Sequence, residues 1–410
     1  MGPAGCTSDE DRAASVSREL ARSLAKPMPD TAAPGAPGVQ GVPKLYVDAT
    51  KSMAGFVGCR QRRTFDAILA RTATDLGVSR VWLFGEQSNT PGLLAEHALD
   101  HGVHCPETYN RLHNPDFALV EAIGRDTRTA VHVYFTDGVQ SATDAGVPSP
   151  SVRALQQWIG GGRALAVLVF RGTFSGPAWS EELQQWTDTV TVKDRPFYAF
   201  LFARSESDID RLLERLSGPV RQSAEVIRVT GAFPQCGVQT AAQHYAKMDS
   251  PPWAMLPPSL TRRLATGAAE VGAYECRIPR EFPLETVLAR TAGTYRKWQG
   301  SAFAQQPGAM PAGASFSTDS VLPTEGGSRV LLIARVPDDP STRFGFYALE
   351  LLPKPGRLRG AVDSLTTDTD AAASTYRRTY RFGWMLEHLV RSEFERRGAP
   401  RQYFITVQYR

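Results

Sequence analysis

The chain has little net charge and no long apolar segment. Its lysines and arginines are scattered among aspartates and glutamates, and the formal net charge is only +4 over 410 residues. Because a nucleic-acid groove needs a concentrated basic patch, we expect no nucleic-acid partner. No run of about eighteen apolar residues occurs, so the sequence predicts no transmembrane span.

Signatures of common catalytic sites are also missing. The chain has no Gly-x-Ser-x-Gly elbow, no glycine-rich phosphate loop with lysine, and no His-Glu-x-x-His pair among its 7 histidines. His101 and His104 lie near Cys105, but a fourth zinc ligand is not evident. We therefore do not expect an enzyme, and a metal-dependent hydrolase stays as an alternative.

The composition is that of an ordinary globular protein, with 42% hydrophobic and 21% charged residues. The length makes two domains the default expectation. Residues 1–43 carry many small residues and little apolar periodicity, so they bury too little surface to offset their ordering entropy. We interpret them as a disordered tether and expect domains at 44–231 and 232–410.

Between residues 44 and 231 the pattern alternates strands and helices. Apolar runs predict strands at 45–47, 78–84, 131–135, 164–170, 197–202 and 226–229. Helices are expected near Thr64, Asn114, Leu155 and Ser205. Alternation with helices of about ten to fifteen residues indicates βαβ units, hence an α/β fold with a mainly parallel, Rossmann-like sheet.

Oxygen-bearing side chains follow the first of these strands. Asp48 ends the strand, and Thr50 and Ser52 come at alternating positions after it. One carboxylate and two hydroxyls are hard ligands, which suit Mg²⁺, or alternatively Mn²⁺ or Ca²⁺, rather than zinc. Two neutral hydroxyls leave such an ion electropositive and able to take an anionic ligand from outside. The alternative is that Thr50 and Ser52 only cap the following helix.

A second mostly apolar strand ends in Thr136-Asp137-Gly138. Two strand-end aspartates, separated by a helix and a strand, fit the edge of an α/β sheet where ligands bind outside the carboxyl ends of parallel strands. The two loops together resemble the metal-ion-dependent adhesion site of von Willebrand factor A domains. In that family the first loop reads Asp-x-Ser-x-Ser, and the third metal loop is commonly Thr-Asp-Gly.

The family's second metal loop normally supplies a threonine just ahead of a helix. This chain has Asn114 and Asp116 in the equivalent stretch and no threonine. Either residue is expected to coordinate the ion directly or through water, or else only to cap the helix. The resemblance therefore implies a metal site made of Asp48, Thr50, Ser52, Asn114, Asp116 and Asp137.

The resemblance implies a module for adhesion or assembly, in which an acidic side chain of a protein partner completes the coordination of the ion. A structural scaffold of the same fold with a degenerate metal site is the alternative, because the second-loop threonine is missing. The partner face is expected to include Lys51, Met53, Phe56, Val139 and Gln140. For Met53 and Phe56, burial beneath the loop is equally expected, since large apolar residues usually pack inside.

Cysteine is scarce, with 5 in the chain, and its distribution bears on the cellular compartment. Ala4-Gly5-Cys6 resembles the cleavage end of a bacterial lipoprotein signal, although no apolar region precedes it, and predicts a lipid anchor at Cys6. Cys59 with Cys105, and Cys236 with Cys276, supply the pairs that one disulfide in each domain would require. Four unpaired thiols in a reducing cytoplasm are the alternative. An extracytoplasmic location is slightly favoured.

Residues 232–410 are expected to form a smaller α+β or β-rich domain. The sequence predicts strands at 273–278, 330–336, 344–352 and 403–409, and one helix at 376–396. No catalytic signature occurs in this half of the chain.

Overall fold

The structure is a computed structural model that describes most of the chain, with gaps. It describes residues 41, 43–59, 63–85, 95–98, 101–109, 116–126, 129–139, 148–181, 183–238, 262–263, 268–290, 295–299, 302–306, 315–324, 327–337, 344–369, 377–398 and 401–407. The expected tether, with Cys6 in it, lies almost wholly outside these ranges.

The first half of the chain forms one seven-stranded sheet in the order β3-β2-β1-β4-β6-β5-β7. Its strands are β1 (Lys44–Asp48), β2 (Arg80–Phe84), β3 (Ala95–Ala98), β4 (Val131–Thr136), β5 (Ala164–Ser180), β6 (Gln185–Ala203) and β7 (Glu225–Arg228). β1 pairs in parallel with β2 and β4, whereas the other neighbours pair antiparallel. The α/β fold is therefore confirmed, and the sheet is mixed, with the two aspartate loops at its parallel centre.

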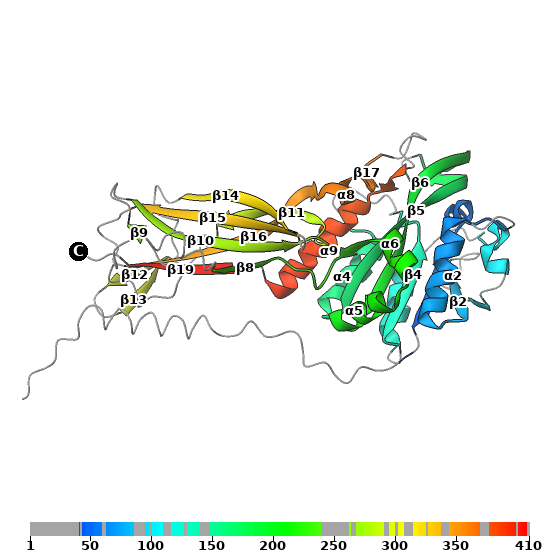
Figure 1. Cartoon of the computed structure of the whole chain (residues 1–410), viewed down its shortest axis with the longest axis horizontal. Helices are drawn as coiled ribbons and strands as arrows, with labels where there is room; N and C mark the ends of the chain where they lie inside the picture. The colour runs from blue at the N-terminus through cyan, green and yellow to red at the C-terminus, as the bar shows by residue number, and fades with distance from the viewer. Residues whose placement is uncertain are drawn as a thin grey trace, which may run out of the picture.

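Helices cover both faces of this sheet (Figure 1). One face packs against α2 (Thr64–Leu76), α5 (Glu206–Arg215) and α6 (Gly218–Ser223), and the other against α3 (Asp116–Arg125), α4 (Pro150–Gly160) and α9 (Phe382–Arg397). Each face of the sheet has its own core cluster, and β1 contributes side chains to both because they alternate in direction. Leu45 and Val47 pack with α2, α5 and α6, and Tyr46 packs with α3, α4 and α9. Both strand-end loops therefore start from a fully covered sheet.

Strands β5 and β6 form a hairpin that is longer than the sheet it belongs to. The sequence predicts strands only at 164–170 and 197–202, but the ladder continues past the pair Trp179–Trp186 to Ser180, which pairs with Gln185. Residues 171–180 of β5 and 185–194 of β6 extend past the sheet as a two-stranded segment, which we call the ribbon (Figure 1). One of its faces is packed, since Phe174 and Ala178 are fully buried.

The C-terminal half is built mainly of antiparallel strands. One sheet has the order β14-β15-β10-β8 with β9 beside β10, a second has the order β11-β16-β19, and β12-β13 and β17-β18 are two-stranded, the last being parallel. Its elements are β8 (Gln235–Val238), β9 (Arg262–Arg263), β10 (Ala268–Pro279), β11 (Leu284–Arg290), β12 (Tyr295–Gln299), β13 (Ala302–Gln306), β14 (Ser315–Thr324), β15 (Gly327–Pro337), β16 (Phe344–Leu358), α8 (Gly360–Asp363), β17 (Thr366–Thr367), β18 (Thr379–Tyr380) and β19 (Arg401–Val407). The four strands and the helix expected in this half overlap β10, β15, β16, β19 and α9.

Helix α9 packs on the α/β sheet, and Figure 1 shows it lying between that sheet and the C-terminal strands. The ring of Phe382 stacks on that of Tyr198 in β6, with centroids 4.2 Å apart. Met385 and Leu389 belong to the same core cluster as Trp158 of α4. The domain boundary expected at residue 231 stays a prediction, and this one cluster contains residues from both sides of it.

None of the helices in the described ranges combines the length and the apolarity that crossing a bilayer would require.

Candidate metal centre

The first strand-end loop brings three oxygen side chains together. Asp48 ends β1 and is buried, with 1% of its surface exposed. The backbone N–H of Thr50 donates to Oδ1 of Asp48 at 2.8 Å, and the hydroxyl oxygens of Thr50 and Ser52 lie 3.0 Å apart. Thr50 precedes the short 3-10 helix η1 (Lys51–Phe56), but its side chain makes no capping hydrogen bond. The structure therefore does not support a role for Thr50 as a helix cap.

The loop that contains Asp137 begins where β4 ends, beside β1. The hydroxyl of Thr136 donates to Oδ2 of Asp48 at 2.9 Å, which joins the two loops directly. Gly138 has a φ of +68°, and its N–H donates to the Thr136 hydroxyl at 3.2 Å. A Cβ at Gly138 would lie 2.6 Å from the ring of Tyr198, so both the backbone conformation and the space require glycine.

Asp137 is buried and has one carboxylate oxygen without a hydrogen bond. Its Oδ1 accepts from the N–H of Val139 at 3.4 Å, whereas Oδ2 accepts from no donor in the described part of the chain. Nη2 of Arg195 in β6 lies 3.8 Å from Oδ2, which is beyond hydrogen-bond length. A buried carboxylate oxygen that accepts no hydrogen bond destabilises the folded state unless a donor or a cation binds it.

The two aspartates are electrostatically linked. Burial, and then the neighbouring Asp137 carboxylate, raise the pKa of Asp48 from 3.8 to about 7, although hydrogen bonds from Thr50 and Thr136 act in the opposite direction. Arg195 balances only one of the two negative charges that the pair carries when both are ionised. When both aspartates are ionised, the pair therefore favours an additional positive charge or a proton on Asp48.

These side chains fit a hard divalent ion. Two carboxylates and two hydroxyls are oxygen donors of the kind that Mg²⁺, Mn²⁺ and Ca²⁺ prefer. Such an ion would give Oδ2 of Asp137 a partner and would place positive charge between the two carboxylates. Of the six expected ligands, the structure gathers four: Asp48, Thr50, Ser52 and Asp137.

The expected ligands from the second metal loop are not among these four. Asn114 lies outside the described residues, and Asp116 is described only as the first residue of α3, without its side chain. Their proposed coordination, direct or through water, stays a prediction.

The ribbon packs against η1. The rings of Phe56 and Phe174 meet edge-on, with centroids 5.1 Å apart. The backbones approach so closely that a Cβ on Gly176 would lie 2.9 Å from the Cα of Gly55. The guanidinium of Arg63 donates to the carbonyl oxygen of Gly55 and to a carbonyl oxygen of β5. The loop after Asp48 is thus held by a segment more than a hundred residues further along the chain.

The expected partner face is only partly exposed. Met53 and Phe56 are fully buried beneath the loop, as the alternative interpretation expects. Lys51 is exposed, and its Nζ lies 4.7 Å from the centre of the Trp186 ring on the ribbon. Val139 is half-buried, and Gln140 lies outside the described residues.

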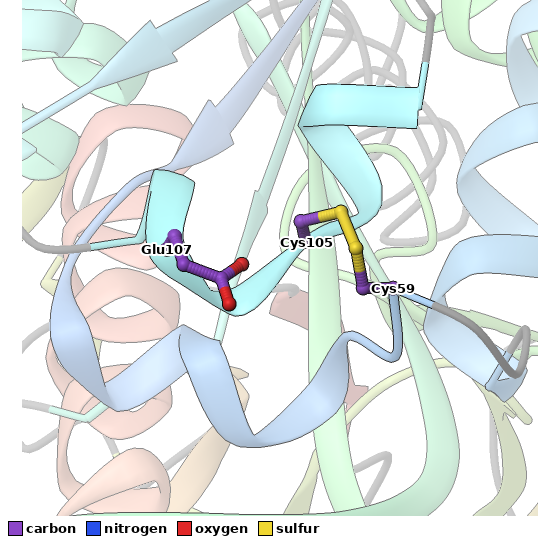
Figure 2. A group of neighbouring side chains, drawn as sticks. All are labelled: Cys59, Cys105 and Glu107. Atoms are coloured by element: carbon purple, nitrogen blue, oxygen red, sulfur yellow. A yellow bond between two sulfur atoms is a disulfide. The ribbon is translucent and has the colours of Figure 1, made fainter.

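A disulfide fixes the chain just after η1. It joins Cys59 to Cys105, which lies between the 3-10 helices η2 (His101–His104) and η3 (Pro106–Thr108), and the Cα atoms are 4.2 Å apart. This confirms the predicted pair. Glu107 lies near both sulfur atoms, as Figure 2 shows, but the sulfurs are bonded to each other and are not thiolate ligands. This group is therefore not a metal centre.

The same bond removes Cys105 from any zinc site with His101 and His104. Nδ1 of His104 lies 3.0 Å from Oδ1 of the fully buried Asp66. The other carboxylate oxygen of Asp66 accepts from the N–H of Arg63 at 2.9 Å. Together with the disulfide, these contacts anchor the chain that follows η1.

Arg195 also lies beside the carboxylate pair, and the sequence does not predict this position. It sits in a short polar run, Lys193-Asp194-Arg195, ahead of an apolar strand, and nothing local distinguishes it. Only the antiparallel pairing of β6 with β4, in which Tyr198 lies opposite Thr136, brings it beside Asp137.

Comparison of the chain with protein-family models, with curated proteins and with solved structures finds no match.

Proposed function

We propose that the chain binds a protein partner through a divalent cation, with Mg²⁺ as the expected ion and Mn²⁺ or Ca²⁺ as alternatives. The observation that carries the proposal is Oδ2 of Asp137, which is buried and accepts no hydrogen bond from the described residues, beside the buried carboxylate of Asp48. Two carboxylates in this arrangement are stabilised by a cation between them. The resemblance of both loops to von Willebrand factor A domains supports the same assignment.

The proposal gives each side chain a role. Asp48 and Asp137 anchor the ion by charge, and Thr50 and Ser52 act as neutral ligands or hold its water molecules. Hydroxyl ligands leave the ion electropositive, so an acidic side chain from the partner completes the coordination. The chemistry is association for adhesion or assembly, and we propose no catalytic step.

A structural scaffold with a degenerate metal site is the second candidate, and one observation favours it. The guanidinium of Arg195 lies 3.8 Å from Asp137 and supplies a permanent positive charge at the site. In this alternative Arg195 takes the place of the ion, and the loops serve only the fold.

An extracytoplasmic location belongs to the same proposal. The disulfide between Cys59 and Cys105 supports it, since disulfides persist in oxidising compartments. A lipid anchor at Cys6 would hold such a protein at a membrane surface through the tether.

Calorimetric titration of the full chain with Mg²⁺ and Mn²⁺ tests the metal site. We expect Asp48→Asn and Asp137→Asn to lose at least about tenfold in affinity, because each removes an anionic ligand but keeps the shape of the side chain. Asp126→Asn is the matched control, since Asp126 pairs with Lys44 at the other end of the sheet. Affinities that stay unchanged in both site variants would overturn the assignment.

The partner face is tested by capture experiments with and without EDTA. We expect Lys51→Glu to abolish capture without lowering the melting temperature by more than a few degrees, because the exposed carboxylate would repel an acidic ligand or occupy the ion. Lys354→Glu, on the C-terminal strands, is the matched charge reversal. If the Lys51 variant still captures its partner in a metal-dependent way, the partner binds elsewhere on the molecule.

A further inference from the structure

A cavity of about 260 Å³ lies at the end of the sheet opposite the candidate metal site. Its described lining includes Gly124 at the end of α3, His132 near the start of β4, Trp158 of α4 and Arg163 just ahead of β5. The two sites lie at opposite ends of one strand, since His132 pairs with Lys44 at the start of β1 and Asp48 ends that strand. The cavity is therefore separate from the metal loops.

Arg163 brings a positive charge to this cavity. Its guanidinium carbon lies 4.5 Å from the centre of the Trp158 ring, and its Nη2 donates to the main-chain carbonyl oxygen of Gly124 at 3.4 Å. It makes no ion pair and no other hydrogen bond within the described residues. The ring covers one face of the guanidinium, whereas the five N–H donors lie in its plane. Most of these donors therefore have no protein acceptor in the described part of the chain.

The surface on which Arg163 stacks is rigid. Trp158 is buried, its Nε1–H donates to the carbonyl oxygen of Ala164 at 3.0 Å, and its ring meets that of Phe202 edge-on with centroids 5.3 Å apart. A guanidinium held against a fixed ring loses less conformational entropy when it binds a ligand. Arg163 is thus positioned for binding before a ligand arrives.

His132 supplies a neutral polar group to the same cavity. Burial lowers the pKa of His132 from 6.5 to about 4, together with the charges of Lys44 and Arg204 and against the effect of Asp126. Its Nδ1 lies 3.1 Å from the hydroxyl of Tyr46, and its other ring nitrogen makes no hydrogen bond within the described residues. When Tyr46 donates to Nδ1, the single N–H of the neutral ring lies on Nε2 and is a donor for a ligand.

The acidic residue of the lining, Asp126, is already engaged. Its Oδ2 lies 2.6 Å from Nζ of Lys44 and accepts from the hydroxyl of Thr129 at 2.8 Å, and its Oδ1 accepts from the N–H of Thr129 at 3.2 Å. This carboxylate pairs with Lys44 and not with Arg163. The cavity therefore offers Arg163 no counter-ion from Asp126.

We propose that this cavity is a second binding site, for a small organic anion whose oxyanion head group pairs with Arg163. The planar fork of an arginine matches a carboxylate or a phosphate equally well, so the shared chemistry is that of a bidentate oxyanion. Ile123 and Ala130 in the lining give the rest of the ligand an apolar surface. The site needs no divalent ion, and its occupation does not depend on the proposed metal-dependent function.

Ligand-observed fluorine NMR of the full chain in EDTA tests this site. The probes are 4-fluorobenzoate and 4-fluorophenyl phosphate, with the neutral 4-fluorobenzamide as the matched isostere. We expect at least one anion to bind about tenfold or more tightly than the amide, because an ionised acceptor strengthens its hydrogen bonds to arginine. The anion that binds more tightly identifies the head group.

Three variants assign the preference to Arg163. Arg163→Met keeps the aliphatic stem along Trp158 and should lose the preference for the anion. Arg153→Met removes an exposed arginine from α4 and should bind like the wild type. In Gly124→Ala the new Cβ would lie 3.1 Å from Nη1 of Arg163, which displaces the guanidinium but keeps its charge. It should bind the anion more weakly without a lower melting temperature, because alanine favours a helix more than glycine does.

Two results would overturn the proposal. The first is a wild type that binds neither anion more tightly than the amide. The second is an Arg163→Met variant that keeps the wild-type preference. Gly124→Ala takes its place in this comparison if Arg163→Met does not fold. Because every titration contains EDTA, a failure here leaves the metal site untouched, and a failure of the metal site leaves this result valid.

Discussion

The hydroxyl of Thr379 donates a hydrogen bond to the main-chain carbonyl oxygen of Asp137 at 3.4 Å, across 242 residues of sequence. The same hydroxyl oxygen accepts from the hydroxyl of Tyr198 at 2.8 Å. All three residues are buried. Strand β18, from the C-terminal half, thus supports the loop that contains Asp137 from within the protein.

Replacing Thr379 by the isosteric valine should weaken both the fold and the metal site. The change leaves the carbonyl of Asp137 and the hydroxyl of Tyr198 without this partner, and a buried polar group left unpaired costs about 1–3 kcal/mol. Urea denaturation and Mn²⁺ titration would measure the two effects. Tyr198→Phe, added to Thr379→Val, should recover part of the stability, whereas Thr369→Val on the exposed surface should change neither quantity.

The stability of the metal-free protein should fall as the pH rises from about 4 to 7. Burial and the neighbouring Asp137 raise the pKa of Asp48 from 3.8 to about 7, so between these values the folded state holds a proton that the unfolded state has released. The free energy of unfolding then decreases with pH, at up to about 1.4 kcal/mol per pH unit from this group. Below about pH 4 the carboxyl of Asp48 is protonated in both the folded and the unfolded state, so it does not lower the free energy of unfolding.

A divalent ion should reverse this dependence, because it replaces the proton on Asp48. Mg²⁺ should therefore raise the melting temperature more at about pH 8 than at about pH 5. Asp48→Asn should remove both the pH effect of this group and the stabilisation by the ion. An equal rise in melting temperature at the two pH values, in the wild type, would contradict the prediction.

The disulfide between Cys59 and Cys105 should be a main stabiliser of the first metal loop. It closes a segment with a sequence separation of 46, for which the loop-entropy relation gives about 4 kcal/mol. We expect Cys59→Ala with Cys105→Ala to lower the free energy of unfolding by that order and to weaken Mn²⁺ binding. Reductant should destabilise the wild type but not the double variant at this site.

A second disulfide is expected in the C-terminal half. Cys236 of β8 and Cys276 of β10 lie directly opposite each other in the antiparallel register, so their Cα atoms are neighbours across the sheet. Intact-mass analysis without reductant should give a mass about 4 Da below that of the fully reduced chain, since each disulfide removes two hydrogens. Alkylation of Cys236 and Cys276 in freshly isolated native protein would contradict this and would favour a reducing compartment.

Alanine at position 55 should disturb the first metal loop through the ribbon. A Cβ on Gly55 would lie 2.2 Å from Cε2 of Phe174, which forces η1 and the ribbon apart. Overpacking of this kind costs about 1–3 kcal/mol, and we expect weaker Mn²⁺ binding with it. Gly160→Ala is the control, because a Cβ there meets nothing within 4 Å. A Gly55 variant with the stability and affinity of the wild type would show that the ribbon does not support the loop.

The parallel centre of the sheet and its two loops could be predicted because their signals are local. Apolar runs that end in Asp48 and in Thr136-Asp137-Gly138 determine both the strand ends and the chemistry of the side chains. The helix that begins after Ser205 could be predicted for the same reason. In the structure the side chain of Ser205 accepts a hydrogen bond from the N–H of Asp208, as expected of an N-cap.

The ribbon and Arg195 could not be predicted, because their positions depend on pairing between distant segments. Residues 171–180 and 185–194 mix apolar and polar side chains without a clear period, and they become a ladder only when β5 and β6 pair. That pairing also explains why Met53 and Phe56 are buried: a residue beside a surface loop becomes part of the core when another segment covers it.

The packing of α9 on α4 has a practical consequence for dividing the protein into fragments. A fragment ending at residue 231 would lack Phe382, Met385 and Leu389, which share a core cluster with Tyr198 and other residues of the sheet face. The exposed apolar patch would make that fragment aggregate or adhere to unrelated proteins. Partners identified with it as bait would then include proteins that bind only the newly uncovered face.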